Sequence, residues 1–183
     1  MAHEDQIMKN MNRWLYFLAA LALYFLIHEN LHALISSLFN EFDAIRWHWY
    51  GPEVIYMTSV EERTPGIKWF FISGVSNFVT LAIGYLTFLL RNKIIVLKSA
   101  LIKNYLFYLA MVFLLCDAVN LSMGPFIYGG DAPGIAAGLN IKPWMIQIFF
   151  GIVLLINREL IAGLMKRYGI HSGNILFKPW RRD

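Results

Sequence analysis

The sequence predicts an all-α polytopic membrane protein with about four transmembrane helices and a small β-hairpin after the first helix. Apolar residues make up 58% of the 183-residue chain and charged residues only 15%, against about 25% charged residues in an average globular protein. The apolar residues also gather in runs long enough to cross the hydrocarbon, which takes about 20 residues. We therefore expect one membrane-embedded domain, 1–183, in a lipid bilayer. The net charge of +4 comes from basic residues at the ends of these runs, so no nucleic-acid partner is expected.

The first transmembrane helix is expected over 14–39, where a polar cluster from His28 to His32 interrupts an almost wholly apolar run. This run is too long for the apolar region of a signal peptide. The segment 44–58 has two β-rich runs about Gly51-Pro52 and predicts a hairpin. Its aromatic side chains suit the membrane surface.

Three further helices follow from the positions of the remaining apolar runs. An uncharged run predicts a helix over 69–90, and a second run predicts a helix over 100–121. The stretch 122–142 is rich in Gly and Pro and is expected to be a broken loop. A fourth helix is expected over 143–166, followed by a basic tail, 167–183.

Four spans would place the amino end, the second loop and the tail on one side of the membrane. Twelve of the 16 Lys and Arg residues fall on that side. Since positive residues gather on the cytoplasmic side, the protein is expected to be a multi-pass integral membrane protein with both termini cytoplasmic.

The first apolar run carries the pattern His28-Glu29-x-x-His32. Histidines at i and i+4 lie on one face of a helix, one turn apart, so both imidazoles can reach one metal ion. Zinc is the expected metal, because two imidazoles, a third protein ligand and a water complete its tetrahedron. Glu29 is then placed to act as the general acid/base.

Ionisable side chains inside a bilayer need a strong reason to be there. A charge at the centre of a spanning helix costs roughly 2.5–3.5 kcal/mol even on a lenient scale. Hydrogen bonding between helices is the alternative explanation for the cluster. Three ionisable residues within five positions favour metal binding.

Two aspartates compete to be the third metal ligand. Asp131 follows two glycines in the broken segment, where the backbone could aim its carboxylate inward; alternatively it caps a short helix over 132–139. Asp117 is the alternative ligand, or else a buried polar residue paired with Asn120 or Lys103. Spacing favours Asp131 only slightly.

Three segments together resemble the site-2 protease family of intramembrane zinc metalloproteases. The first is His28-Glu29-x-x-His32 in a membrane helix. The second, Gly74-Val75-Ser76-Asn77, is similar to the G-x-x-N element of the family. The third runs from Asn120 to Gly130-Asp131 and resembles the later Asn-Pro-Asp-Gly region. Leu31 and Ala132 stand where family members commonly have glycine.

The resemblance implies specific roles for the residues of these segments. One zinc ion per chain would be held by three side chains: His28, His32 and Asp131. Glu29 would act as the general acid/base. Asn77 and Asn120 would contact the substrate, with hydrogen bonds between helices as the alternative.

The function expected from this pattern is hydrolysis of peptide bonds in or near the transmembrane segments of a membrane-anchored protein substrate. The hairpin resembles a family feature that pairs with an unwound substrate. The alternative is a non-catalytic membrane protein that binds metal for transport or sensing. Such a protein would keep the histidines and the aspartate but would have little use for Glu29.

Overall fold

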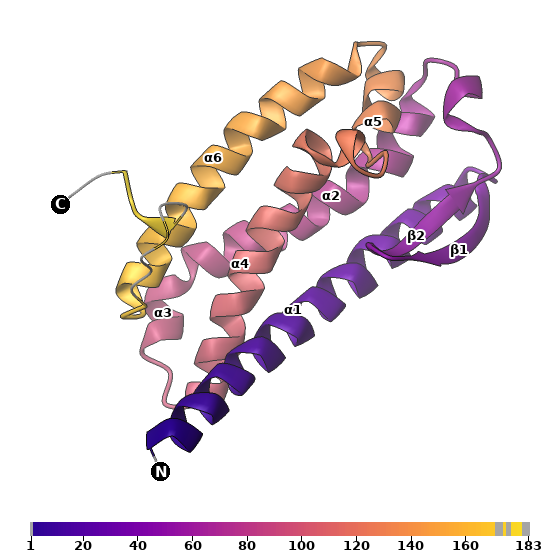
Figure 1. Cartoon of the computed structure of the whole chain (residues 1–183). Coiled ribbons are helices and arrows are strands. Elements are labelled where there is room, and N and C mark those ends of the chain that lie inside the picture. Colours follow the sequence, from indigo (N-terminus) through magenta and orange to yellow (C-terminus); the bar gives the residue numbers. More distant parts are fainter. Residues whose placement is uncertain (1, 171–173, 175–176, 181–183) are drawn as a thin grey trace.

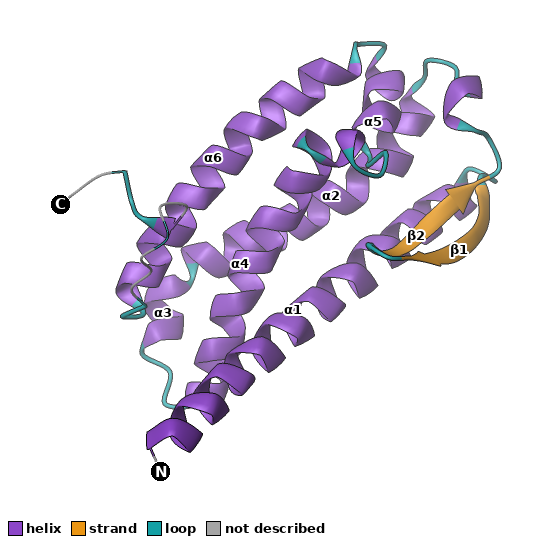
Figure 2. Ribbon diagram, in the orientation of Figure 1, coloured by secondary structure: helices purple, strands orange, loops and turns teal. Residues whose placement is uncertain are grey.

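The computed structural model consists of long helices packed side by side, with a two-stranded antiparallel sheet against the first (Figures 1 and 2). The structure describes residues 2–170, 174 and 177–180. Within these residues four helices are long and apolar enough to cross a membrane: α1 (Ala2–Leu38) through its part Met11–Leu38, α2 (Ile67–Leu89), α4 (Ala100–Ser122) and α6 (Pro143–Arg167). The predicted fold class is confirmed.

The helices differ from the sequence prediction mainly at their ends. α1 begins at Ala2 and not at residue 14, because the polar segment before Trp14 contains no Gly or Pro to stop a helix. A short helix that was not predicted, α3 (Arg91–Ile95), follows α2. In the tail predicted over 167–183, residues 171–173, 175–176 and 181–183 lie outside the described part of the chain.

The broken segment 122–142 is interrupted as predicted, but it contains two short helical pieces. A 3-10 turn covers Gly124–Phe126, and α5 covers Ala132–Leu139. Each has a proline in its first turn, where the missing N–H costs nothing and the fixed φ suits a helix.

The predicted hairpin is present as β1 (Phe42–His48) and β2 (Gly51–Tyr56). The strands are antiparallel, with Ile45 opposite Val54. β2 packs against α1, and Val54 is buried between them. The hairpin therefore lies over the part of α1 that carries the His28 cluster (Figure 1).

Several polar side chains are buried inside the bundle beside its apolar core, whereas many large apolar side chains are exposed on its outer surface. On α1 one residue in every four is buried along a single face: Ala20, Tyr24, His28, His32 and Ser36. On α2 the buried face carries Ser76, Asn77 and Thr80, whereas Phe78 is 79% exposed. This distribution suits helices that contact lipid tails outside and hydrogen-bond to each other inside.

α4 is the central helix and contacts α1, α2 and α6. The start of α1, α3 and the end of α6 lie at one end of the bundle, and the hairpin and α5 lie at the other (Figure 1). The start of α1 and the end of α6 thus lie at the same end of the bundle, as four spans require. The cytoplasmic placement of that side stays a prediction.

Gly138 allows α5 to pack directly on the backbone of α2. A Cβ at this position would lie 2.2 Å from the backbone nitrogen of Phe70, which cannot swing aside as a side chain could. We expect Gly138→Ala to push α5 away from α2 and to lower the free energy of unfolding by about 1–3 kcal/mol. The measurement is the thermal unfolding midpoint of the purified protein in detergent.

Gly151, on α6, offers the matched control, because a Cβ there would meet no heavy atom within 4 Å. Gly151→Ala is expected to leave the midpoint unchanged or slightly higher, since Ala favours the helix. An equal loss of stability in both variants would contradict the packing role of Gly138.

Candidate metal centre

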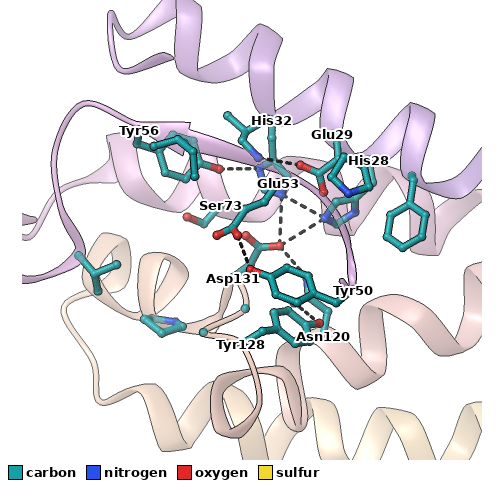
Figure 3. A pocket seen from close by; sticks show the side chains of 18 of the residues that line it. His28, Glu29, His32, Tyr50, Glu53, Tyr56, Ser73, Asn120, Tyr128 and Asp131 are labelled. Carbon is teal, nitrogen blue, oxygen red and sulfur yellow. Dashed lines mark hydrogen bonds and ion pairs between the residues drawn. The ribbon is translucent and has the colours of Figure 1, made fainter. Parts of the chain in front are cut away.

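A cavity of about 700 Å³ lies between α1, the hairpin and the segment that leads into α5. Its wall includes the three residues of the predicted cluster, His28, Glu29 and His32, together with Asp131. Figure 3 shows the two imidazoles and the Asp131 carboxylate pointing toward one another across this wall. The bundle thus brings together residues that are far apart in the sequence.

Three ligand atoms form a nearly equilateral triangle. His28 Nε2 and His32 Nε2 are 3.1 Å apart, and Asp131 Oδ2 lies 3.4 Å from the first and 3.2 Å from the second. Ligand atoms about 2.0–2.2 Å from a tetrahedral zinc ion lie about 3.3–3.6 Å from one another. The group of His28, His32 and Asp131 could therefore hold a metal ion, and all three residues line the cavity.

The other nitrogen of each imidazole faces an oxygen atom. His32 Nδ1 lies 2.7 Å from the carbonyl oxygen of Ile72, which can only accept, so His32 carries its proton on Nδ1. His28 Nδ1 lies 3.3 Å from Oδ1 of Asp117 without a hydrogen bond to it. When both rings are neutral, each Nε2 lies within 3.4 Å of Asp131 Oδ2, and a cation between the three atoms would stabilise them.

Asp131 occupies the N-cap position of α5, but its side chain makes no capping hydrogen bond. Its Oδ2 instead accepts hydrogen bonds from Asn77 Nδ2 at 2.8 Å and Asn120 Nδ2 at 2.7 Å. Gly130 makes this possible: its φ is +55°, and a Cβ there would lie 2.8 Å from the carbonyl oxygen of Asn120. The two predicted glycines thus let the chain fold back over α4 and turn the carboxylate inward.

The charge on Asp131 is set by its neighbours. Burial raises the pKa of this carboxyl, but the imidazoles of His32 and His28, when they carry a positive charge, hold its pKa well below the usual range. A bound cation would act on the carboxylate in the same direction as these charged rings.

Asp117 lies behind His28, away from the triangle. Its carboxylate accepts hydrogen bonds from the hydroxyl of Tyr24 at 2.8 Å and from that of Thr80 at 2.7 Å. It pairs with neither Asn120 nor Lys103, the two partners expected from the sequence. A carboxylate behind a metal-binding imidazole fixes the orientation of the ring and raises its basicity, so the position of Asp117 suits an outer-shell role.

Asn77 and Asn120 point at the metal group, which is the set of His28, His32 and Asp131. Beyond their bonds to Asp131, Asn120 Nδ2 donates to Asn77 Oδ1 at 3.2 Å, and Asn120 Oδ1 accepts from the Tyr128 hydroxyl at 3.0 Å. These bonds fix the carboxylate in place. Their predicted contact with the substrate stays a prediction.

Glu29 lies beside the triangle, on the wall of the cavity. Its Oε2 accepts a hydrogen bond from the backbone N–H of Val54 at 3.1 Å. β2 pairs with β1 along its other edge, so this N–H belongs to the edge of the sheet that faces the site. Glu29 therefore links α1 to the free edge of the hairpin.

Two residues at the site were not predicted. The Ser76 hydroxyl lies 2.7 Å from His32 Nε2, and the Tyr56 hydroxyl lies 3.1 Å from His32 Nδ1. Ser76 could have been found, because the polar residues of the second apolar run recur at helical spacing: Ser73, Ser76, Asn77 and Thr80. The role of Tyr56 could not be predicted, because the hairpin contains several aromatic residues and no pattern distinguishes one of them.

Comparison of the chain with protein-family models, with curated proteins and with solved structures gives no match. The function is therefore inferred from the geometry of the site.

Proposed function

We propose that the protein is an intramembrane zinc metalloprotease, similar to the site-2 proteases, that hydrolyses peptide bonds in or near the transmembrane segments of membrane-anchored substrates. One observation supports this most strongly. The triangle of His28, His32 and Asp131 has the spacing of a tetrahedral metal site, and Glu29 stands next to it on the cavity wall.

Zinc suits the donor set of two neutral imidazoles and one carboxylate, which leaves the fourth position open as in catalytic zinc sites. When bound, zinc supplies a Lewis acid for the substrate carbonyl and lowers the pKa of a water molecule. His28, His32 and Asp131 would hold it.

Glu29 would move the proton during hydrolysis. Its carboxylate accepts a proton as the water oxygen bonds to the carbonyl carbon, and it delivers that proton to the amine nitrogen as the C–N bond breaks. Because Glu29 is only half-buried and opens on the cavity, water and substrate can both reach it.

The substrate must be unwound at the bond that is cut, because helical amides are hydrogen-bonded and shielded. The free edge of β2 offers backbone groups to an extended segment, as in other proteins that bind a peptide by adding it to a sheet. The N–H of Val54 already points from this edge toward Glu29. An extended substrate along β2 would pass the metal group.

A non-catalytic metal-binding protein, for transport or sensing, is the second candidate function. The bond between Glu29 and Val54 favours it, because this bond gives the carboxylate a structural use. A measurement of peptide hydrolysis separates the two candidate functions, because only the protease cleaves peptide bonds.

Removal of the metal tests the proposal. The purified protein in detergent is expected to contain one zinc per chain and to cleave a fluorescein-labelled unfolded protein such as casein. Chelation is expected to abolish cleavage, because the Lewis acid and the activated water are lost together. Addition of zinc, but not of magnesium, should restore it, since imidazoles select zinc over magnesium. Cleavage that survives complete removal of the metal would contradict the proposal.

A further inference from the structure

We propose that Arg63 is a specificity-determining residue that binds a carboxylate of the substrate inside the cavity of the metal group. This inference rests on the proposed function for the identity of the ligand as a protein substrate. The carboxylate belongs either to an acidic side chain or to a free carboxyl terminus of the substrate.

Arg63 is held in the cavity wall by two aromatic rings. Its Cζ lies 4.4 Å from the centre of the Trp69 ring and 5.2 Å from that of Tyr56, and the side chain lines the same cavity as the metal group. The hydroxyl of Tyr56 reaches the metal group, because it lies 3.1 Å from His32 Nδ1. One aromatic side chain therefore separates the guanidinium from a metal-binding imidazole.

The guanidinium has no acceptor among the residues that the structure describes. Its Nε is buried without a hydrogen-bond partner, and no described carboxylate lies within ion-pair distance of it. Two nearby acids are engaged elsewhere: Glu41 binds Lys68 at 2.6 Å, and Glu62 binds Ser59. Glu61 lines the same cavity but forms no ion pair with the guanidinium. A partly buried cation without a counter-ion is costly, so the wall of the cavity offers an unfilled place for an anion.

The shape of the Arg63 guanidinium indicates which kind of anion it would bind. A guanidinium presents its N–H donors as a planar fork that matches the two oxygens of a carboxylate. Contact with the rings of Trp69 and Tyr56, whose planes lie 76° apart, restricts the guanidinium before the ligand arrives. Burial lowers the pKa of the Arg63 guanidinium, and a bound carboxylate would offset that effect.

Binding of matched peptides tests the proposal without any need for cleavage. The probes are labelled extended peptides of Gly, Ala and Leu with either Glu or Gln at one position, each with a free or an amidated carboxyl terminus. The protein is the full chain with Glu29→Gln, in detergent, and the readout is fluorescence anisotropy. We expect a carboxylate to tighten binding roughly 10- to 100-fold, the size of a charge-assisted hydrogen bond. The amidated and free-acid arms show which carboxylate is bound.

Variants of Arg63 assign the preference to this residue. Arg63→Met is expected to abolish the difference between the Glu and Gln probes, and Arg63→Lys to keep part of it, because Lys retains the charge but not the fork. Arg63→Glu should instead prefer the Gln probe over the Glu probe, because two carboxylates repel each other. Arg46→Met removes the same charge from the exposed face of β1 and should keep the full preference. Equal binding of all probes by the protein with native Arg63, or a preference that survives Arg63→Met, overturns the proposal.

The outcome is separable from the test of hydrolysis. If the protein prefers carboxylate probes but cleaves nothing, the protease proposal fails and the anion site stands. If cleavage is observed and Arg63→Met lowers kcat equally for Glu and Gln substrates, Arg63 acts on the reacting carbonyl, and the specificity proposal is overturned while the protease stands.

Discussion

Replacing His32 with alanine is expected to reduce the zinc content of the purified protein from one per chain to nearly none. His32 Nε2 is one corner of the triangle, 3.1 Å from His28 Nε2 and 3.2 Å from Asp131 Oδ2. Loss of a corner leaves two ligands, and the fall in affinity should exceed the roughly 10- to 100-fold cost of losing an outer-shell partner. Elemental analysis after gel filtration measures the metal, and cleavage activity should fall in parallel.

The two aspartates give the sharpest contrast within this prediction. Asp131→Ala is expected to empty the site as His32→Ala does, whereas Asp117→Asn should retain zinc with affinity lowered by roughly 10- to 100-fold. His48→Ala, at an exposed histidine on β1, is the control and should keep full zinc. A site emptied only by the change at Asp117 would show that the third ligand has been assigned to the wrong residue.

Glu29→Gln is expected to keep zinc and to lose peptide hydrolysis by about 10²- to 10⁴-fold, the usual contribution of a general acid/base. The amide oxygen of glutamine can still accept the N–H of Val54, so the link between α1 and β2 should hold. Glutamine cannot take a proton from water, so the chemical step should fail. Zinc content and cleavage rate, measured on the same sample, give the result.

Glu53 provides the matched control for Glu29. It also lines the cavity, but its carboxylate accepts a hydrogen bond from the Tyr50 hydroxyl at 2.5 Å and pairs with His48. Glu53→Gln is expected to lower cleavage less than about tenfold, because it removes no proton carrier. Wild-type cleavage in Glu29→Gln would refute the catalytic role and leave metal transport or sensing as the better candidate.

The spanning helices and the hairpin could be predicted because each depends on a local property of the sequence. Charge-free runs end at basic residues, and the β-rich runs of 44–58 flank Gly51-Pro52. Helix was not predicted before Trp14, because the polar composition of this segment is typical of a solvent-exposed segment. It contains no residue that stops a helix, and α1 begins at Ala2. α3 was missed because a single turn of helix has no periodicity to detect.

The metal group was only partly predictable for a different reason. His28 and His32 share one helix, so their spacing alone places them together. Asp131 approaches them through the path of the segment that follows α4, and the sequence favoured it over Asp117 only slightly. The donors around it, including Ser76 and Tyr56, depend on how α2 and the hairpin pack. Tertiary contacts of this kind leave little trace in one sequence.

The division of the metal group along the chain has a consequence for biosynthesis. His32 and Asp131 are separated by 99 positions, so a nascent chain carries two of the three candidate ligands into the membrane long before the third leaves the ribosome. Until α4 and the turn after it are in place, an ion would find only two of the three candidate ligands. Loading is therefore expected to be a late event in maturation, and premature termination before residue 131 should yield a metal-free product.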